Sequence, residues 1–174
     1  MVDENLVRKY NPTTPPIHPK VFQNIDRSFK TGFEIFGDLK FANYFNFITE
    51  IAYVYTENQD FNESLPLTPP WVTRLKLGYE KGKVWASAQY TLTARQSKIA
   101  TTYDEIATRG YEVMDLKVGY KPLKNFSIGA SVLNLFDQYY NNHLTFAFNN
   151  QAGFGRTPIT EPGRNFTLFL NYKF

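Results

Sequence analysis

The chain has 174 residues, a formal net charge of +3 and no cysteine, and 17% of its residues are aromatic. This length suits one domain, the charge is too small to indicate a nucleic-acid partner, and the lack of cysteine excludes disulfides and thiolate chemistry. No apolar run approaches the ~18 residues of a transmembrane helix. A high aromatic content with a mean hydropathy of −0.40 suits a membrane β-barrel, a soluble barrel or a sandwich.

Residues 1–20 are polar and contain four prolines, which predicts a loop. After this loop, apolar and polar residues alternate with period two, the pattern of strands that have one apolar and one polar face. The predicted strands are Val21–Phe41, Phe45–Glu57, Trp71–Tyr79, Val84–Arg95, Tyr111–Tyr120, Phe126–Asn134 and Arg164–Phe174. About seven antiparallel strands are therefore expected.

The last strand shows the alternation most clearly. Its apolar residues share one parity: Phe166, Leu168, Leu170, Tyr172 and Phe174. About ten residues are enough to cross a bilayer as a tilted strand but far too few to cross as a helix. One face of this strand could meet lipid and the other a watery lumen.

The connections alternate between short turns and long loops. The turns fall near 42–44, 80–83 and 121–125, and the loops span 58–70, 96–110 and 137–163. Transmembrane barrels have short periplasmic turns and long extracellular loops, whereas a soluble meander has no reason to separate them. The charged residues lie opposite the apolar parity: Glu34, Asp38, Glu50, Arg74, Lys76, Asp115 and Lys117.

Aromatic residues on the apolar parity form two groups. Those at the short-turn end are Phe41, Phe45, Tyr79, Tyr120, Tyr172 and Phe174, and those at the long-loop end are Tyr53, Tyr55 and Trp71. Two such bands are typical of the interfacial girdles of membrane barrels.

Four segments resemble motifs of TonB-dependent outer-membrane receptors. They are Gln23–Asp26 with Thr31–Glu34, Leu65–Trp71, Val132–Leu144 (VLNLFDQYYNNHL) and Glu161–Asn165 (EPGRN). The last motif leads into a strand that ends in Phe174. The four stand in the family's order over nearly the whole chain, in a style closest to siderophore or metal receptors.

The resemblance implies a segment of a 22-stranded transmembrane barrel with an N-terminal plug inside it. Residues 1–174 match the last seven strands or so, with 1–20 as an extracellular loop, and no part resembles a plug or a TonB-binding box. The implied function is TonB-driven uptake of a siderophore-iron or other metal complex across the bacterial outer membrane. The implied partners are the remaining barrel strands and plug, which could be on another polypeptide, together with TonB, lipid and the substrate.

Few residues suggest chemistry. His143 and Arg164 are candidate substrate contacts, although His143 also fits a structural loop residue and Arg164 fits a partner for a lumen carboxylate. Asp104 and Glu105 are interpreted as solvated loop charges. The Gly78–Lys83 run is one residue short of a phosphate loop and has Val84 where a hydroxyl is needed. No catalytic, metal or cofactor site is predicted, so an enzyme is not expected.

Two other readings remain open. One is a small independent outer-membrane barrel with a structural or adhesion role, although bacterial single-chain barrels use even strand numbers. The other is a soluble ligand-binding barrel of lipocalin type, whose apolar face would point inward. Periodicity alone does not distinguish the two orientations.

Overall fold

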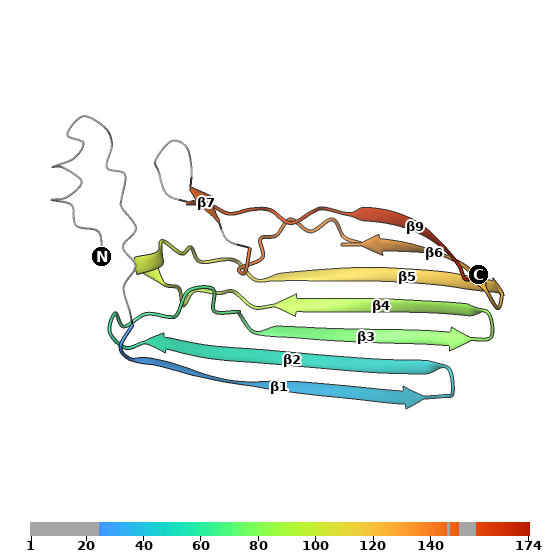
Figure 1. The fold of residues 1–174 in the computed structure, drawn as a ribbon, viewed down its shortest axis with the longest axis horizontal. Coiled ribbons are helices and arrows are strands. Elements are labelled where there is room, and N and C mark those ends of the chain that lie inside the picture. The colour runs from blue at the N-terminus through green and yellow to red at the C-terminus, as the bar shows by residue number, and fades with distance from the viewer. Residues whose placement is uncertain (1–24, 146, 150–155) are drawn as a thin grey trace.

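The computed structural model describes residues 25–145, 147–149 and 156–174, and the predicted loop at 1–20 lies outside them. The described residues form a seven-stranded sheet in the order β1-β2-β3-β4-β5-β6-β9 (Figure 1). Its strands are β1 (Ser28–Phe41), β2 (Phe45–Asn58), β3 (Val72–Lys81), β4 (Val84–Thr93), β5 (Tyr111–Leu123), β6 (Phe126–Leu133) and β9 (Asn165–Tyr172). The connections carry a 3-10 turn, η1 (Thr101–Tyr103), and a short hairpin of β7 (Phe148–Asn149) and β8 (Arg156–Thr157).

The structure confirms the predicted all-β, antiparallel class and each predicted strand, with shifts at some ends. β1 begins at Ser28, and residues 21–24 of the predicted strand lie outside the described residues. β5 continues to Leu123 instead of ending at Tyr120, and the register with β6 shifts between these two residues. Pro122 lies within this irregularity, where its missing N–H breaks no regular ladder of hydrogen bonds.

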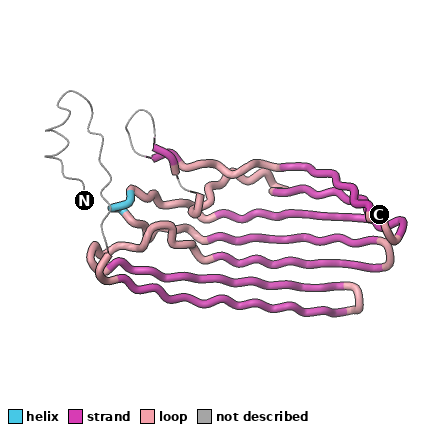
Figure 2. The backbone as a smooth tube through the Cα atoms, viewed as in Figure 1, coloured by secondary structure: helices cyan, strands magenta, loops and turns pink. Residues whose placement is uncertain are grey.

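The sheet is open. β9 pairs with β6, as predicted, and β1 pairs with β2. Among the described residues neither β1 nor β9 has a strand on its other side. The predicted separation of connections is also present, since the long loops gather at one end and the short turns at the other (Figure 2). In the described part of the chain, no helix is long and apolar enough to cross a membrane.

Strand register shows that the predicted charged set shares one face. Residues directly opposite each other in an antiparallel pair project to the same side. Glu50 is opposite Arg74, Lys76 is opposite Gln89, and Gln89 is opposite Asp115. The same face continues through Lys117, Ser131 and Thr167 to β9. The apolar set lies on the other face, running from Leu77 through Ala88, Leu116 and Val132 to Phe166.

The apolar face of the sheet has no covering layer within the described residues. Leu168 is 83% exposed and Phe166 is 73% exposed, and no large side chain of the described residues is fully buried. Burial is found mainly at the long-loop end, in polar residues such as Ser64, Thr68 and Gln96. An exposed apolar face of this extent needs contact with something outside the chain.

Candidate functional site: the loop layer

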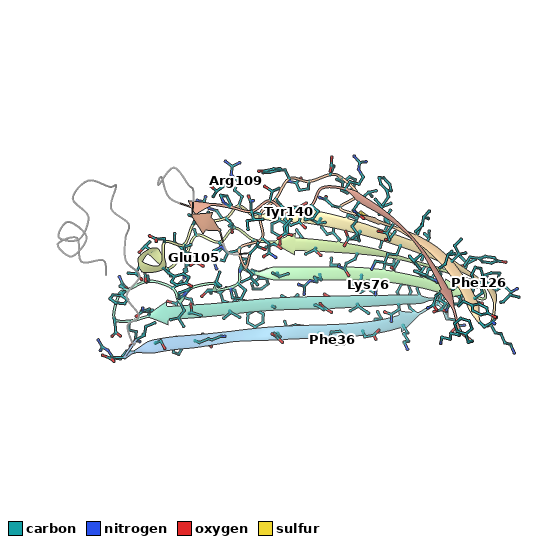
Figure 3. The ribbon with its side chains drawn as sticks, turned by 45° about the horizontal axis from the view of Figure 1, so that its top comes forward. Phe36, Lys76, Glu105, Arg109, Phe126 and Tyr140 are labelled. Carbon is teal, nitrogen blue, oxygen red and sulfur yellow. The ribbon has the colours of Figure 1, made fainter. Side chains whose placement is uncertain are left out.

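The described parts of the three long loops pack together into one structure, which we call the loop layer and define as residues 59–71, 94–110, 134–145, 147–149 and 156–164. Glu105 lies at its centre, close to η1 and far from Phe126 at the short-turn end (Figure 3). The carboxylate of Glu105 accepts hydrogen bonds from the backbone N–H groups of Leu67, at 2.7 Å, and Ala100, at 2.8 Å. One side chain therefore joins the first loop to the second.

The interpretation of Glu105 as a solvated charge is wrong, because its side chain is only 5% exposed. Backbone donors replace the water that a buried carboxylate loses. Asp104 does lie at the surface, in the left-handed conformation with φ 56°. No local pattern marks Glu105 as buried, because Leu67 is 38 residues away in the sequence.

His143 brings the third loop to Glu105. Its Nε2 lies 3.2 Å from Glu105 Oε1, and its Nδ1 lies 3.2 Å from the hydroxyl of Thr108. The Nε2 contact is not aligned as a hydrogen bond. Burial lowers the pKa of His143, and the neighbouring Glu105 only partly opposes this effect. The imidazole is therefore more readily neutral than an exposed histidine.

The cavity beside His143 is too small for a nutrient. Its volume is about 20 Å³, and Leu67, Glu105, Ile106 and Thr108 form part of its wall. That is about the size of one water molecule. The structure thus places His143 inside the loop layer, and its predicted contact with substrate stays a prediction.

Further contacts link the first two loops. The hydroxyls of Thr101 and Thr102 and the backbone N–H of Thr102 donate to the carboxylate of Glu63. Although partial burial opposes the shift, these hydrogen bonds lower the pKa of Glu63. The Gln96 amide donates to the carbonyl of Thr68 at 3.0 Å. These contacts make the loops one packed layer rather than separate excursions.

Arg164 lies where two of the motif segments meet. Its backbone N–H donates to Asp137 Oδ1 at 2.7 Å, and its guanidinium lies 3.9 Å from Asp137 Oδ2. A Cβ on Gly163 would lie 2.7 Å from the same Oδ1, so glycine permits this close approach. The Asn134 side chain supports the turn by accepting from the N–H of Gln138 at 2.8 Å. Arg164 thus pairs with Asp137, and its predicted substrate contact stays a prediction.

Aromatic contacts confirm that the two predicted bands gather at opposite ends of the sheet. At the short-turn end, Phe45 has ring centroids 5.5 Å from Phe41 and 5.1 Å from Tyr79. At the long-loop end, Tyr53 and Trp71 are 5.7 Å apart. The sheet therefore has an apolar face bordered by aromatic groups at both ends.

The described residues contain no cluster of three or more histidine, cysteine or carboxylate groups able to hold a metal ion. The loop layer instead provides a packed surface at one end of the sheet, which suits the recognition of a ligand.

Comparisons with known proteins agree with this architecture. Residues 5–135 match a family model described as "TonB dependent receptor-like, beta-barrel". The chain is 33% identical over 119 residues to the catecholate siderophore receptor Fiu of Escherichia coli (strain K12), a match that covers 67% of this chain and 15% of Fiu. The chain thus spans about 15% of the length of the curated relatives that it matches.

Solved structures give the same result. The copper transporter OprC superimposes with a TM-score of 0.78 and 29% identity, over 84% of this chain and 24% of OprC. The ferric enterobactin receptor PfeA of Pseudomonas aeruginosa superimposes with a TM-score of 0.71 and 22% identity, over 87% of this chain and 23% of PfeA. At 22% identity, the superposition on PfeA supports the fold alone.

Proposed function

The chain belongs to the TonB-dependent receptor family of outer-membrane transporters, which are not enzymes, and we propose that it forms part of the wall and outer loops of a receptor for scarce nutrients. The observation that carries the proposal is the loop layer at one end of an open, apolar-faced sheet. In the proposed receptor, further barrel strands close the sheet and a plug fills the lumen. Energy coupled through TonB drives uptake.

The apolar face is proposed to meet lipid. From Phe45 to Tyr55 the strand β2 advances ten residues, about 33 Å along its axis. A tilt of ~40° reduces this to ~25 Å along the membrane normal, the height of the apolar band of an outer-membrane barrel. The aromatic groups then lie at the two interfaces, and the charged face lines the lumen. This orientation makes the loop layer extracellular and argues against the soluble barrel.

The proposed substrate is a siderophore-iron complex. Support comes from the 33% identity to a protein named as a catecholate siderophore receptor. Copper is a second candidate because OprC is named as a copper transporter. Copper binding uses mainly cysteine, methionine and histidine ligands, and this chain has no cysteine, two methionines and two histidines. Within this chain, that composition favours a bulky complex over a bare ion.

Arg164 and His143 keep their proposed roles as substrate contacts, in different ways. The Arg164 side chain is 44% exposed, so its charge is open to an anionic complex even while it lies near Asp137. His143 is buried and would reach a substrate only if the third loop opened. Arg164→Gln should therefore weaken uptake more than His143→Gln at low substrate concentration.

Uptake by cells tests the function. Cells that carry the intact receptor should accumulate radioactive iron supplied as a catecholate complex, and not copper supplied as a salt. Deleting most of residues 141–160 should impair uptake while surface labelling shows normal insertion. Normal uptake by the deletion variant would mean that the third loop has no active role in transport. Uptake of copper without uptake of iron would make copper the substrate.

A further inference from the structure

A second pocket lies on the long-loop end, away from Glu105 and His143. It exists because β2 is longer than its neighbour: β2 runs to Asn58, but its pairing with β3 ends at Ala52 opposite Val72. Residues 53–57 of β2 therefore have no ladder partner on that side, and beyond them Asn58 forms an isolated bridge with Glu63. The pocket in this gap has a volume of about 210 Å³.

Aromatic rings and two cations line this pocket. Tyr53, Tyr55 and Trp71 come from the aromatic group at the long-loop end, while Arg95 and Lys98 come from the segment after β4. Both cations are exposed, and neither forms an ion pair among the described residues. Lys98 Nζ lies 4.5 Å from the centroid of the Tyr55 ring, a cation–π contact.

One carboxylate contacts a ring of the pocket. The hydroxyl of Tyr55 donates to Glu57 Oε2 at 3.0 Å, which fixes Glu57 against the tyrosine. Arg95, Lys98 and Glu57 together carry two positive charges and one negative charge. The balance favours an anionic ligand, and the rings offer flat surfaces for an apolar or sugar portion.

The position of the pocket indicates the source of the ligand. Tyr53, Tyr55 and Trp71 lie at the border of the apolar face on the long-loop side, where an embedded protein meets lipid headgroups. Basic pockets at such borders bind anionic headgroups, and arginine suits the oxygens of a phosphate. In the orientation proposed above, the headgroups at this border are those of the outer leaflet.

We propose that this pocket binds the phosphorylated sugar headgroup of an outer-leaflet glycolipid. Arg95 and Lys98 contact the phosphate, and Tyr53, Tyr55 and Trp71 contact the sugar and the start of the acyl chains. The bound lipid fills the gap beside β2 that strand pairing leaves open. The proposal rests on the outward orientation of the apolar face but not on the identity of the transported substrate.

Lipid retention by the intact receptor tests the proposal. The receptor is reconstituted in phosphatidylcholine nanodiscs with about 5% diphosphoryl lipid A, and retained lipid A is counted by native mass spectrometry after transfer to detergent. Retention should fall about tenfold or more in Arg95→Gln/Lys98→Gln, since each cation near a membrane surface contributes attraction. Lipid A without phosphates should be retained no better by the wild type than by the variant.

A matched control removes two positive charges at the other end. Lys83→Gln/Lys121→Gln has the same net charge as the test variant, and both lysines lie at the short-turn end. This control should retain lipid A like the wild type. Soluble glucosamine 6-phosphate at millimolar concentration should not displace the lipid, because it lacks acyl chains.

The outcomes separate this proposal from the proposed function. Equal retention by the wild type and Arg95→Gln/Lys98→Gln, or equal loss in the lysine control, overturns the lipid site. Displacement by the soluble sugar phosphate would make the pocket a site for soluble ligands instead. Iron uptake should stay normal in Arg95→Gln/Lys98→Gln. A failure of iron uptake in the wild type would overturn the proposed function but would leave the lipid result intact.

Discussion

Glu105 shows how one buried residue organises three loops. Its carboxylate receives two backbone N–H groups and lies against His143, so residues from three separate connections meet at one side chain. A buried carboxylate is stable only when donors replace water. The fold supplies those donors from the backbone of Leu67 and Ala100, and it brings His143 against the same carboxylate.

Removing this carboxylate should loosen the loop layer. Glu105→Ala leaves the N–H groups of Leu67 and Ala100 without their acceptor, and each unsatisfied buried donor costs about 1–3 kcal/mol. We expect the free energy of local opening to fall by about 3 kcal/mol, measured by hydrogen exchange at these two amides in the intact receptor. Arg109→Gln, an exposed change in the same loop, is the control. Unchanged protection in Glu105→Ala would show that the Glu105 carboxylate does not hold the loops together.

The loop layer should also respond to pH through His143. Burial lowers the pKa of His143 in the closed layer, so an opened layer binds a proton more readily. Between the lowered pKa and the ordinary value of about 6.5, the open state holds more protons, and closed-state stability rises with pH. Acidification from about pH 7.5 to 5 should therefore increase exchange in residues 96–110, after correction for intrinsic rates. His143→Gln should remove this dependence, and a wild type with no pH dependence would contradict it.

At the scale of elements, a row of four residues crosses the charged face near the short turns. Trp85 is opposite Gly119, Gly119 is opposite Gly129, and Gly129 is opposite Phe169. The two rings lean over the glycines and meet with centroids 6.0 Å apart and planes 25° apart. Both glycines are buried. A Cβ on Gly119 would lie 2.2 Å from the Trp85 ring, so the row depends on the missing side chains.

Glycine-to-alanine substitutions can test this row. In Gly129→Ala the new Cβ would lie 2.3 Å from Phe169 Cζ and 2.7 Å from the Val118 carbonyl oxygen. Overpacking of this kind costs about 1–3 kcal/mol, so the urea midpoint of the intact receptor in detergent should fall. Gly78→Ala is a matched control on the same face, since its Cβ would lie 3.6 Å from the Asn46 carbonyl oxygen. If the two variants unfold at the same midpoint, the row has no special role.

The strands and the loop layer differ in how far the sequence predicts them. Alternation between residues two apart is a local signal, and it located each strand and the shared charged face. Trp85 and Phe169 stand on the predicted polar parity, yet their meeting depends on the register of four strands. Glu105 and His143 are harder still, because loop contacts between residues 38 positions apart follow no periodicity. Only tertiary structure brings them together.

At the scale of the whole molecule, the two faces of the sheet should meet different solvents. Spin labels at Leu168, Ala88 and Leu116 should report contact with lipid in the reconstituted receptor, because these residues share the apolar face. Labels at Thr167, Gln89 and Lys117 should report water or protein instead. The reverse pattern would mean that the apolar face points inward, which would restore the soluble-barrel alternative.

The open edges determine how the 174-residue chain behaves by itself. β1 and β9 each lack a strand on one side within the described residues, and in lipid every unsatisfied backbone N–H or C=O costs several kcal/mol. In water, open edges beside an exposed apolar face favour aggregation. The isolated chain, refolded in detergent, should therefore elute as mixed oligomers in size-exclusion chromatography with light scattering. Co-refolding it with a polypeptide that carries the missing barrel strands should yield one defined species, because those strands pair with both edges. A monodisperse monomer of the isolated chain would mean that the outer strands are satisfied without partners, either by pairing with each other or by another route, and would remove the physical reason for a larger barrel.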